Sequence, residues 1–418
     1  MISGVASVSS VSSVSSVSAS TPAAVDQAVA PDVVSVYTAR QLDPAIAARA
    51  IMAAQQAGGA SMTLNGGVLG LLAVRRGGQP VQQAPAGYRW PLSTVVMPAE
   101  VVGRTTSRSV ARIVATGQVV LGQTTATLHN VQAGDVLTLL GWDSAAHDVV
   151  VGMVAPDEVV GGTELMISPG VAQTVAMARP SSVVLWGFQS RAELDQQLTA
   201  AGLVANDIRI RRSWDPPDPD GLIGYPTIKT KLGEFAYAGS GNSMVQEPGW
   251  AAAHITRVTL PLGIRASCHN VVIPALQGAL GEVAAAGLAG AIDVGNTNTY
   301  GGCYYPHEIT PLGSTTGGLL SKHSWGMAID MNTVQNPEGR PPTMNCDVVR
   351  IFRKWGFAWG GNFLQGDGMH FEWVGERRDQ WAYPSRYCPN IVAPTPLGST
   401  AAGAPSGRVL LFSLGDGH

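Results

Sequence analysis

Two short segments near the C-terminal end of this chain concentrate imidazole and carboxylate side chains. One contains His323 and Asp330, and the other contains Asp367, His370 and Glu372. Two imidazoles and a carboxylate suit a catalytic zinc ion, which commonly takes three protein ligands and keeps its fourth position for water. A further carboxylate must then take a proton from that water and pass it to the leaving amine. We therefore expect His323, Asp330 and His370 to be ligands of Zn²⁺, with Asp367 as the first candidate for the base. Glu372 is the second candidate, or the partner that orients a ligand histidine.

Short strands are expected to position these side chains. Residues 326–332 alternate so that Asp330 lies on the face opposite to a row of apolar side chains. Residues 369–373 alternate so that His370 and Glu372 point together away from the apolar face. The pattern thus predicts that both segments present their polar groups from strands.

Low charge makes this cluster conspicuous. Charged residues are 13% of the 418-residue chain, against about 25% in average proteins. The formal net charge is −3, so the sequence lacks the basic patch typical of nucleic-acid binding, and no nucleic-acid partner is expected. The densest apolar part of the uncharged stretch 50–74 is too short to span a bilayer, so no integral membrane segment is expected either.

The length predicts at least two folded units. Residues 1–35 are a low-complexity Ser/Val/Ala segment that we expect to be disordered, without the basic start and continuous apolar stretch of a secretion signal. Residues 36–213 are expected to form a β-rich α+β accessory region of unknown role. Residues 214–224 form a Pro/Asp-rich linker, 225–390 the domain that holds the cluster, and 391–418 a flexible tail.

Periodicity and turn residues predict the individual elements. Asp43 followed by Pro44 is typical of a helix start. Helices are expected over 45–56, 191–201, 270–290 and 345–356, and strands over 113–121, 135–142, 147–154, 163–168, 182–188 and 208–212.

All four cysteines lie in the C-terminal half: Cys268, Cys303, Cys346 and Cys388. An even number in one domain indicates two disulfides in an oxidising compartment, with three possible connectivities. Buried free thiols are an equally weighted alternative.

Two other hydrolytic mechanisms fail on the sequence. His307-Glu308 begins like the His-Glu-x-x-His zinc motif, but Pro311 stands where the second histidine is required. Serine enzymes that act on cell-wall peptides need Ser-x-x-Lys, and no serine lies three positions before any of the four lysines.

The spacing resembles that of a known family. Ser-x-His-x-x-Gly-x-Ala-x-Asp at 321–330, followed by Asp-x-x-His at 367–370, is similar to the motifs of peptidase family M15. These are zinc D-alanyl-D-alanine carboxypeptidases and L-alanyl-D-glutamate endopeptidases of bacterial cell walls and phage endolysins, and the likeness extends over about 225–390. It implies an α+β domain with a small antiparallel sheet, of the hedgehog/DD-peptidase-like fold. It also implies the ligand set and base named above, and peptidoglycan stem peptides as the partner.

One departure from the family pattern concerns an arginine upstream of the first ligand, which helps to hold the developing oxyanion. Here the corresponding place holds His307, which we expect to take the role of the arginine in catalysis. Because a histidine is charged only part of the time near neutral pH, we expect the enzyme to have reduced activity, or activity biased to mildly acid conditions, unless Arg340 or Arg265 substitutes. Ser321 and Tyr305 are the candidate substrate-binding residues.

The sequence favours the carboxypeptidase slightly over the endopeptidase. A non-catalytic peptidoglycan-binding protein that retains the zinc fold is the alternative from another class. The substrate and the cysteines predict an extracytoplasmic or cell-wall location, and the oligomeric state stays open.

Overall fold

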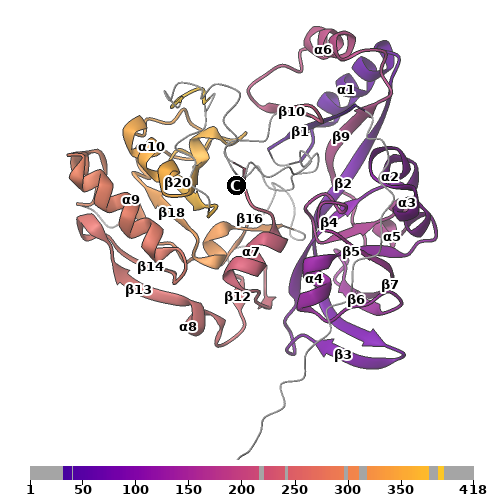
Figure 1. Ribbon diagram of the computed structural model, residues 1–418, viewed down its shortest axis with the longest axis horizontal. Coiled ribbons are helices and arrows are strands. Elements are labelled where there is room, and N and C mark those ends of the chain that lie inside the picture. The colour runs from indigo at the N-terminus through magenta and orange to yellow at the C-terminus, as the bar shows by residue number, and fades with distance from the viewer. Residues whose placement is uncertain are drawn as a thin grey trace, which may run out of the picture.

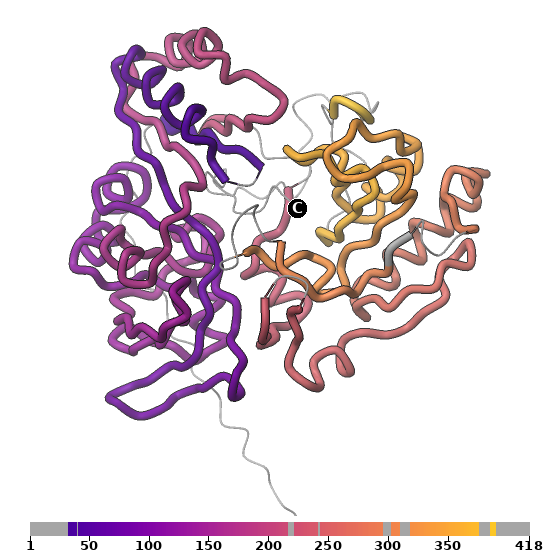
Figure 2. The backbone as a smooth tube through the Cα atoms, turned by 180° about the vertical axis from the view of Figure 1, so that it is seen from behind, coloured from indigo at the N-terminus to yellow at the C-terminus, as the bar shows by residue number. Residues whose placement is uncertain are grey.

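The computed structural model describes residues 32–39, 41–215, 221–240, 243–295, 300–309, 318–375 and 385–389. They form a mixed α+β structure with two lobes that lie side by side in both views (Figures 1 and 2). Of the segment 1–35 that we expected to be disordered, the first 31 residues lie outside the described residues, as do the proline-rich centre of the linker and the expected tail. The prediction is wrong for residues 33–35, which form the start of the buried strand β1 (Val33–Thr38).

A closed six-stranded barrel forms the centre of the N-terminal lobe. Its strands follow the order β2-β4-β8-β5-β7-β6, and β6 pairs again with β2. Closure depends on the length of β2, since its residues 65–71 pair with β4 and its residues 70–75 pair with β6. The strands are β2 (Ala60–Arg76), β4 (Trp90–Val96), β5 (Val119–Gly122), β6 (Val136–Leu140), β7 (Ala146–Ala155) and β8 (Leu165–Ile167).

Further elements surround the barrel. The strand β3 (Gln79–Gln83) pairs with β2. Four short helices accompany them: α2 (Ala99–Thr105), α3 (Arg108–Ala115), α4 (Gln123–Leu128) and α5 (Pro169–Thr174). No helix in the described part of the chain is long and apolar enough to cross a membrane.

A side layer continues the same sheet beyond the first residues of β2. It consists of β9 (Pro180–Trp186), β1 (Val33–Thr38) and β10 (Ile208–Arg212), with α1 (Pro44–Gln56) and α6 (Arg191–Ala200) packed on it. The Asp43 carboxylate accepts hydrogen bonds from the N–H groups of Ala45 and Ile46, as expected of an N-cap. The predicted helices at 45–56 and 191–201 and the strand at 208–212 are thereby confirmed.

The strand predicted over 113–121 is wrong in its first half. The structure has the helix α3 up to Ala115 and a strand only from Val119. Ser107 caps this helix, and Val110 and Val114 are buried on one face at the helical spacing of four residues. Tertiary burial of that face outweighs the β-propensity of the valines.

The C-terminal lobe contains the small antiparallel sheet β15-β18-β20-β19. Its strands are β15 (Tyr300–Gly301), β18 (Ala328–Met331), β19 (Phe357–Trp359) and β20 (His370–Trp373). The helices α9 (Ile273–Ala285) and α10 (Cys346–Lys354) share one hydrophobic core with it, in agreement with the helices predicted there.

Shorter elements complete this lobe. They are α7 (Tyr225–Leu232), β11 (Tyr237–Ala238), β12 (Val245–Gln246), α8 (Trp250–His254), β13 (Ile255–Thr259), β14 (Arg265–His269), β16 (Glu308–Ile309), β17 (Leu319–Leu320) and the 3₁₀ turns η2 (Pro261–Gly263), η3 (Ala289–Ala291), η4 (Lys322–Trp325) and η5 (Gly360–Asn362).

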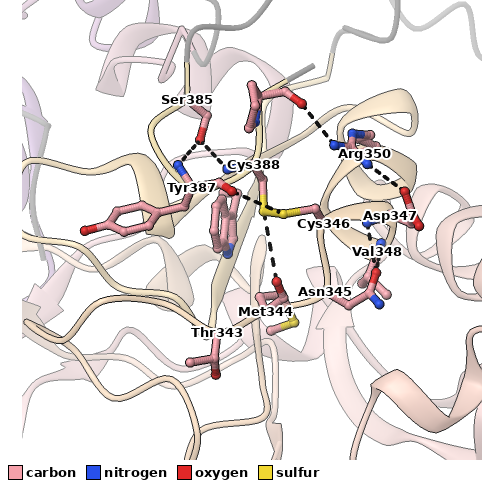
Figure 3. The surroundings of a disulfide bond; sticks show 12 residues. Thr343, Met344, Asn345, Cys346, Asp347, Val348, Arg350, Ser385, Tyr387 and Cys388 are labelled. Carbon is pink, nitrogen blue, oxygen red and sulfur yellow. Dashed lines mark hydrogen bonds and ion pairs between the residues drawn. A yellow bond between two sulfur atoms is a disulfide. The ribbon is translucent and has the colours of Figure 1, made fainter. Parts of the chain in front are cut away.

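Two disulfides cross-link the C-terminal lobe: Cys268 with Cys303, and Cys346 with Cys388. The second ties the start of α10 to residues 385–389 (Figure 3). There the Ser385 hydroxyl accepts hydrogen bonds from the N–H groups of its neighbours two and three positions on. The pairing settles the connectivity that the sequence left open and excludes free thiols.

A buried ionic network joins the lobes. The Lys229 ammonium of α7 lies 2.6 Å from carboxylate oxygens of both Glu164 and Glu234, and it also donates to the Pro91 carbonyl of β4. The His129 Nε2 atom lies 3.0 Å from the other oxygen of Glu234. Glu164 belongs to the barrel lobe, so the lysine of one lobe neutralises a buried carboxylate of the other.

Charge pairing outweighs desolvation in this network. Burial would lower the pKa of Lys229, but Glu164 and Glu234 raise it above its usual value. Burial would likewise raise the pKa of Glu234, but Lys229 and His129 lower it to about 2. Lys229 and Glu234 therefore stay charged at neutral pH without water around them.

Removing one member of such a network leaves an uncompensated buried charge. We expect Lys229→Met to lower the free energy of unfolding by about 3–5 kcal/mol, measured by denaturant titration. Lys231→Met, on an exposed position of the same helix, is the matched control and should change stability by less than about 0.5 kcal/mol. Equal stability of the two variants would contradict this account.

Candidate metal centre

Three elements of the C-terminal lobe bring the predicted ligands together. His323 comes from η4, Asp330 from β18 and His370 from β20. Asp330 and His370 are direct cross-strand partners, so their side chains leave the sheet on the same face. One potential ligand atom from each of the three residues lies within 4.8 Å of the others.

The distances suit a small cation. The Asp330 Oδ1 atom lies 3.3 Å from His323 Nε2 and 3.2 Å from His370 Nδ1. Ligand atoms around a tetrahedral zinc, with bonds of about 2.0–2.1 Å, are separated by about 3.3 Å. The Asp330 side chain is 23% exposed while both imidazoles are nearly covered, so the cluster opens to solvent on the side of the carboxylate.

Local sequence explains the position of His323. The Ser321 hydroxyl accepts a hydrogen bond from the His323 N–H and starts the 3₁₀ turn. Gly326 ends the turn at φ +64°, where a Cβ atom would lie 2.7 Å from Ile255 and 3.0 Å from the His269 nitrogen. A glycine is therefore required for the chain to turn from the first ligand into β18.

A backbone carbonyl orients the His323 ring. Its Nδ1 atom lies 3.1 Å from the carbonyl oxygen of Cys303. A carbonyl can only accept, so Nδ1 carries the proton and Nε2 presents its lone pair toward Asp330. This arrangement is common for metal-binding histidines.

Glu372 supports His370 from the same strand. Its Oε2 atom lies 3.4 Å from His370 Nε2, while the other ring nitrogen faces Asp330. Burial would lower the pKa of His370, but the hydrogen bonds with Asp330 and Glu372 raise it to about 10. Burial would raise the pKa of Asp330, but His323 and His370 hold it well below its usual range. Uptake of a metal ion must therefore release a proton from this cluster.

Asp367 lies in the loop that leads into β20. Its N–H donates to the carbonyl of Gly360, and its own carbonyl accepts from the N–H of His370. The loop passes so close to Gly360 that a Cβ atom there would lie 2.5 Å from the Asp367 carbonyl oxygen. Burial raises the pKa of the Asp367 carboxyl to about 6, although His370 counteracts it. A carboxylate with a pKa in this range suits a general base.

Two buried oxygens beside the cluster lack partners. Oδ1 of Asp367 and Oε1 of Glu372 accept no hydrogen bond from any residue that the structure describes. Buried acceptors are normally satisfied, so these two atoms mark a place for a ligand with positive charge or protons to donate. Together with the donor set of His323, Asp330 and His370, this observation fits a zinc site.

The remaining predicted residues occupy different surroundings. The His307 ring lies 6.2 Å from the His323 ring and contacts Tyr305, which is exposed. Burial lowers the pKa of His307. Ser321 is fully buried as the cap of η4, which supports a positioning role rather than contact with a substrate.

The two arginines considered as substitutes differ in position. Arg340 follows Gly339, whose N–H donates to the carbonyl of Gly366 directly before the predicted base. Arg265 begins β14, at the opposite end of that strand from His269. Of the two, Arg340 is therefore the one whose chain segment contacts the loop that contains Asp367.

Sequence reasoning missed two groups that shape the site. One is the Cys303 carbonyl, which no side-chain pattern reveals. The other is Ser324, whose hydroxyl donates to the His307 carbonyl and accepts from the His307 N–H. The position of Ser324 directly after His323 was the available signal.

Comparison with known proteins supports the motif. A family model described as D-alanyl-D-alanine carboxypeptidase, of the M15 peptidases, matches residues 314–373. The extracellular domain of the noncanonic ABC-type transporter YknZ from Gram-positive bacteria aligns with 43% of this chain and 99% of that domain, at 9% identity and a TM-score of 0.26. A search of curated proteins found no match. The C-terminal region of the chain, which carries the cluster, thus matches the M15 family of peptidases.

Proposed function

We propose that the C-terminal lobe is a zinc-dependent peptidase of the hedgehog/DD-peptidase-like fold that hydrolyses peptidoglycan stem peptides as a D-Ala-D-Ala carboxypeptidase. The observation that carries this proposal is the cluster of His323, Asp330 and His370 together with Asp367, whose buried Oδ1 atom accepts no hydrogen bond from the described residues. The family match over these residues supports it. In this proposal residues 225–390 are the catalytic domain and 36–213 the accessory region.

Each residue has a distinct task in the proposed reaction. Zinc bound to the three ligands would polarise the scissile carbonyl and lower the pKa of a water molecule to about 7. Asp367 accepts a proton from the attacking water and delivers it to the nitrogen of the departing D-alanine, so the C–N bond breaks after the new C–O bond forms. Glu372 holds the His370 ring in place.

Tyr305 and His307 are the groups that would contact the substrate. Tyr305 is exposed beside His307 and offers an aromatic face and a hydroxyl. In this proposal His307, whose ring lies 6.2 Å from that of His323, assists the developing oxyanion when it is charged. We propose an extracytoplasmic location, because stem peptides lie outside the cytoplasm and the two disulfides are compatible with an oxidising space.

Metal and product analysis test the proposal. The purified protein should bind one zinc ion and release D-alanine from a peptide ending in D-Ala-D-Ala. His370→Ala should lose most of the zinc, whereas Asp367→Asn should keep it and lose at least a hundredfold in turnover, since only the proton transfer is removed. Cleavage between L-Ala and D-Glu would instead identify an endopeptidase. Zinc without any cleavage would favour the peptidoglycan-binding alternative, and full zinc occupancy in His370→Ala would refute the ligand set.

Replacing His307 tests the missing arginine. A guanidinium is charged at all relevant pH values, so His307→Arg should raise turnover at neutral pH. His147→Arg is the control, because His147 pairs with Asp143 in the barrel lobe and not near the cluster. Steady-state kinetics on the same peptide measure the turnover. An unchanged or lower turnover in His307→Arg would contradict a role for a positive charge at this position.

The two disulfides make different demands on the site. Cys303 carries the carbonyl that orients His323, while Cys346 and Cys388 hold the start of α10. We expect the double variant Cys268→Ser/Cys303→Ser to weaken zinc binding by about tenfold or more. The double variant Cys346→Ser/Cys388→Ser should lose a similar amount of stability and little zinc affinity. Chelator competition on the folded proteins measures this, and equal zinc affinities would contradict the expectation.

A further inference from the structure

A short hairpin lies between the barrel and the metal cluster. Its strands β16 and β17 pair Glu308 with Leu320. His307 directly precedes this hairpin and Ser321 directly follows it. The Ser321 N–H donates to the His307 carbonyl over 3.1 Å, and the Ser321 hydroxyl caps the turn that carries His323. Any shift of the hairpin would therefore move both histidines.

The barrel holds one strand of this hairpin through Arg89, which stands directly before β4. The backbone of Arg89 exchanges two hydrogen bonds with Tyr237, of 2.9 and 2.8 Å, and its guanidinium lies 4.1 Å from the centre of that ring. The same guanidinium donates to the Gly239 carbonyl and lies 3.5 Å from the buried carboxylate of Glu308. Burial raises the pKa of the Tyr237 hydroxyl to about 12, and the nearby Glu308 carboxylate acts in the same direction.

The barrel also holds the other strand, through α7. The Leu320 N–H of β17 donates to the hydroxyl of Tyr225, the first residue of α7. One turn further on, Lys229 donates to the carbonyl of Pro91 and pairs with Glu164. Both attachments start within three residues of the barrel chain, at Arg89 and Pro91.

We propose that Arg89 of the barrel is a positioning residue for the metal centre, acting through Glu308 and the β16–β17 hairpin on His307 and His323. This inference rests on the proposed zinc peptidase function. It gives the N-terminal lobe a part in catalysis, as the frame that fixes one side of the active site.

Charge burial makes this contact consequential. The Glu308 side chain is 3% exposed, and the Arg89 guanidinium provides part of the compensation for its buried charge. Loss of the guanidinium leaves the buried carboxylate with less compensation for its charge, which favours its movement toward water. The hairpin that carries Glu308 would move with it. A bound metal tolerates deviations of only about 0.2 Å in ligand distance, so a small shift at His323 lowers affinity.

Full-length Arg89→Ala is the principal variant. It should bind zinc about tenfold more weakly by chelator competition, with a lower kcat and little change in KM. The backbone amides of Leu320 and Ser321 should exchange hydrogen faster. Arg76→Ala is the matched control, since Arg76 pairs with Asp135 inside the barrel lobe. It should lose a comparable amount of stability, but its zinc affinity and the exchange of the Leu320 and Ser321 amides should stay as in the wild-type protein.

Two further experiments separate positioning from general stability. A cavity of about 220 Å³ borders Arg89 and Glu308, so added guanidinium ion at non-denaturing concentration should restore zinc affinity in Arg89→Ala. Gly70→Ala keeps the arginine but displaces it, because a Cβ atom there would lie 2.5 Å from the Arg89 Cδ atom. It should reproduce the zinc and exchange effects even if Arg89→Ala folds poorly.

The outcomes distinguish this inference from the proposed function. The positioning role would be overturned if Arg89→Ala and Gly70→Ala had the same zinc affinity and the same amide exchange rates as Arg76→Ala. If the wild-type protein showed no peptidase activity, the proposed function would fail. The exchange of the Leu320 and Ser321 amides would still decide whether Arg89 positions the hairpin.

Discussion

The pairing of β18 with β20 is the constraint on which the metal centre depends. Asp330 stands directly opposite His370, and Glu372 stands opposite Ala328, whose small side chain leaves room on the same face. A slip of one residue would turn His370 toward the hydrophobic core and Phe371 toward the face that carries the cluster. Phe371 is fully buried against Phe352, so the hydrophobic core fixes the register that the chemistry needs.

The sequence was sufficient to find the cluster because its information is local. Alternation in each strand sets which side chains share a face, and the spacing of Ser321, His323 and Gly326 encodes a capped turn with a left-handed end. The groups that orient these residues come from other parts of the chain. The Cys303 carbonyl reaches His323 through a disulfide and a loop, and no spacing rule predicts such a contact.

In the N-terminal lobe, long-range contacts determine the architecture more than local sequence patterns do. The strands from β6 to β10 could be predicted from β-like runs and turn residues, whereas β1 to β4 and the barrel were not predicted. Closure requires β6 to pair with β2, and the residues that meet, such as Leu71 and Leu139, are far apart in the sequence. The wrong strand at 113–115 has a related cause, since valine favours strands until a capped, buried helix face outweighs that preference.

The junction between the lobes contains charges where an apolar contact would serve stability as well. Replacing a buried ion pair with hydrophobic residues is often neutral or stabilising. What Lys229, Glu164 and Glu234 add is geometry. The contacts that cross between the lobes, Lys229 to Glu164 at 2.6 Å and His129 to Glu234 at 3.0 Å, are satisfied in only one relative placement of the lobes. Apolar surfaces tolerate sliding, whereas a displaced ammonium would be left desolvated and unpaired. A fixed placement is what a site needs when one side of it is attached to the barrel through Arg89 and Glu308.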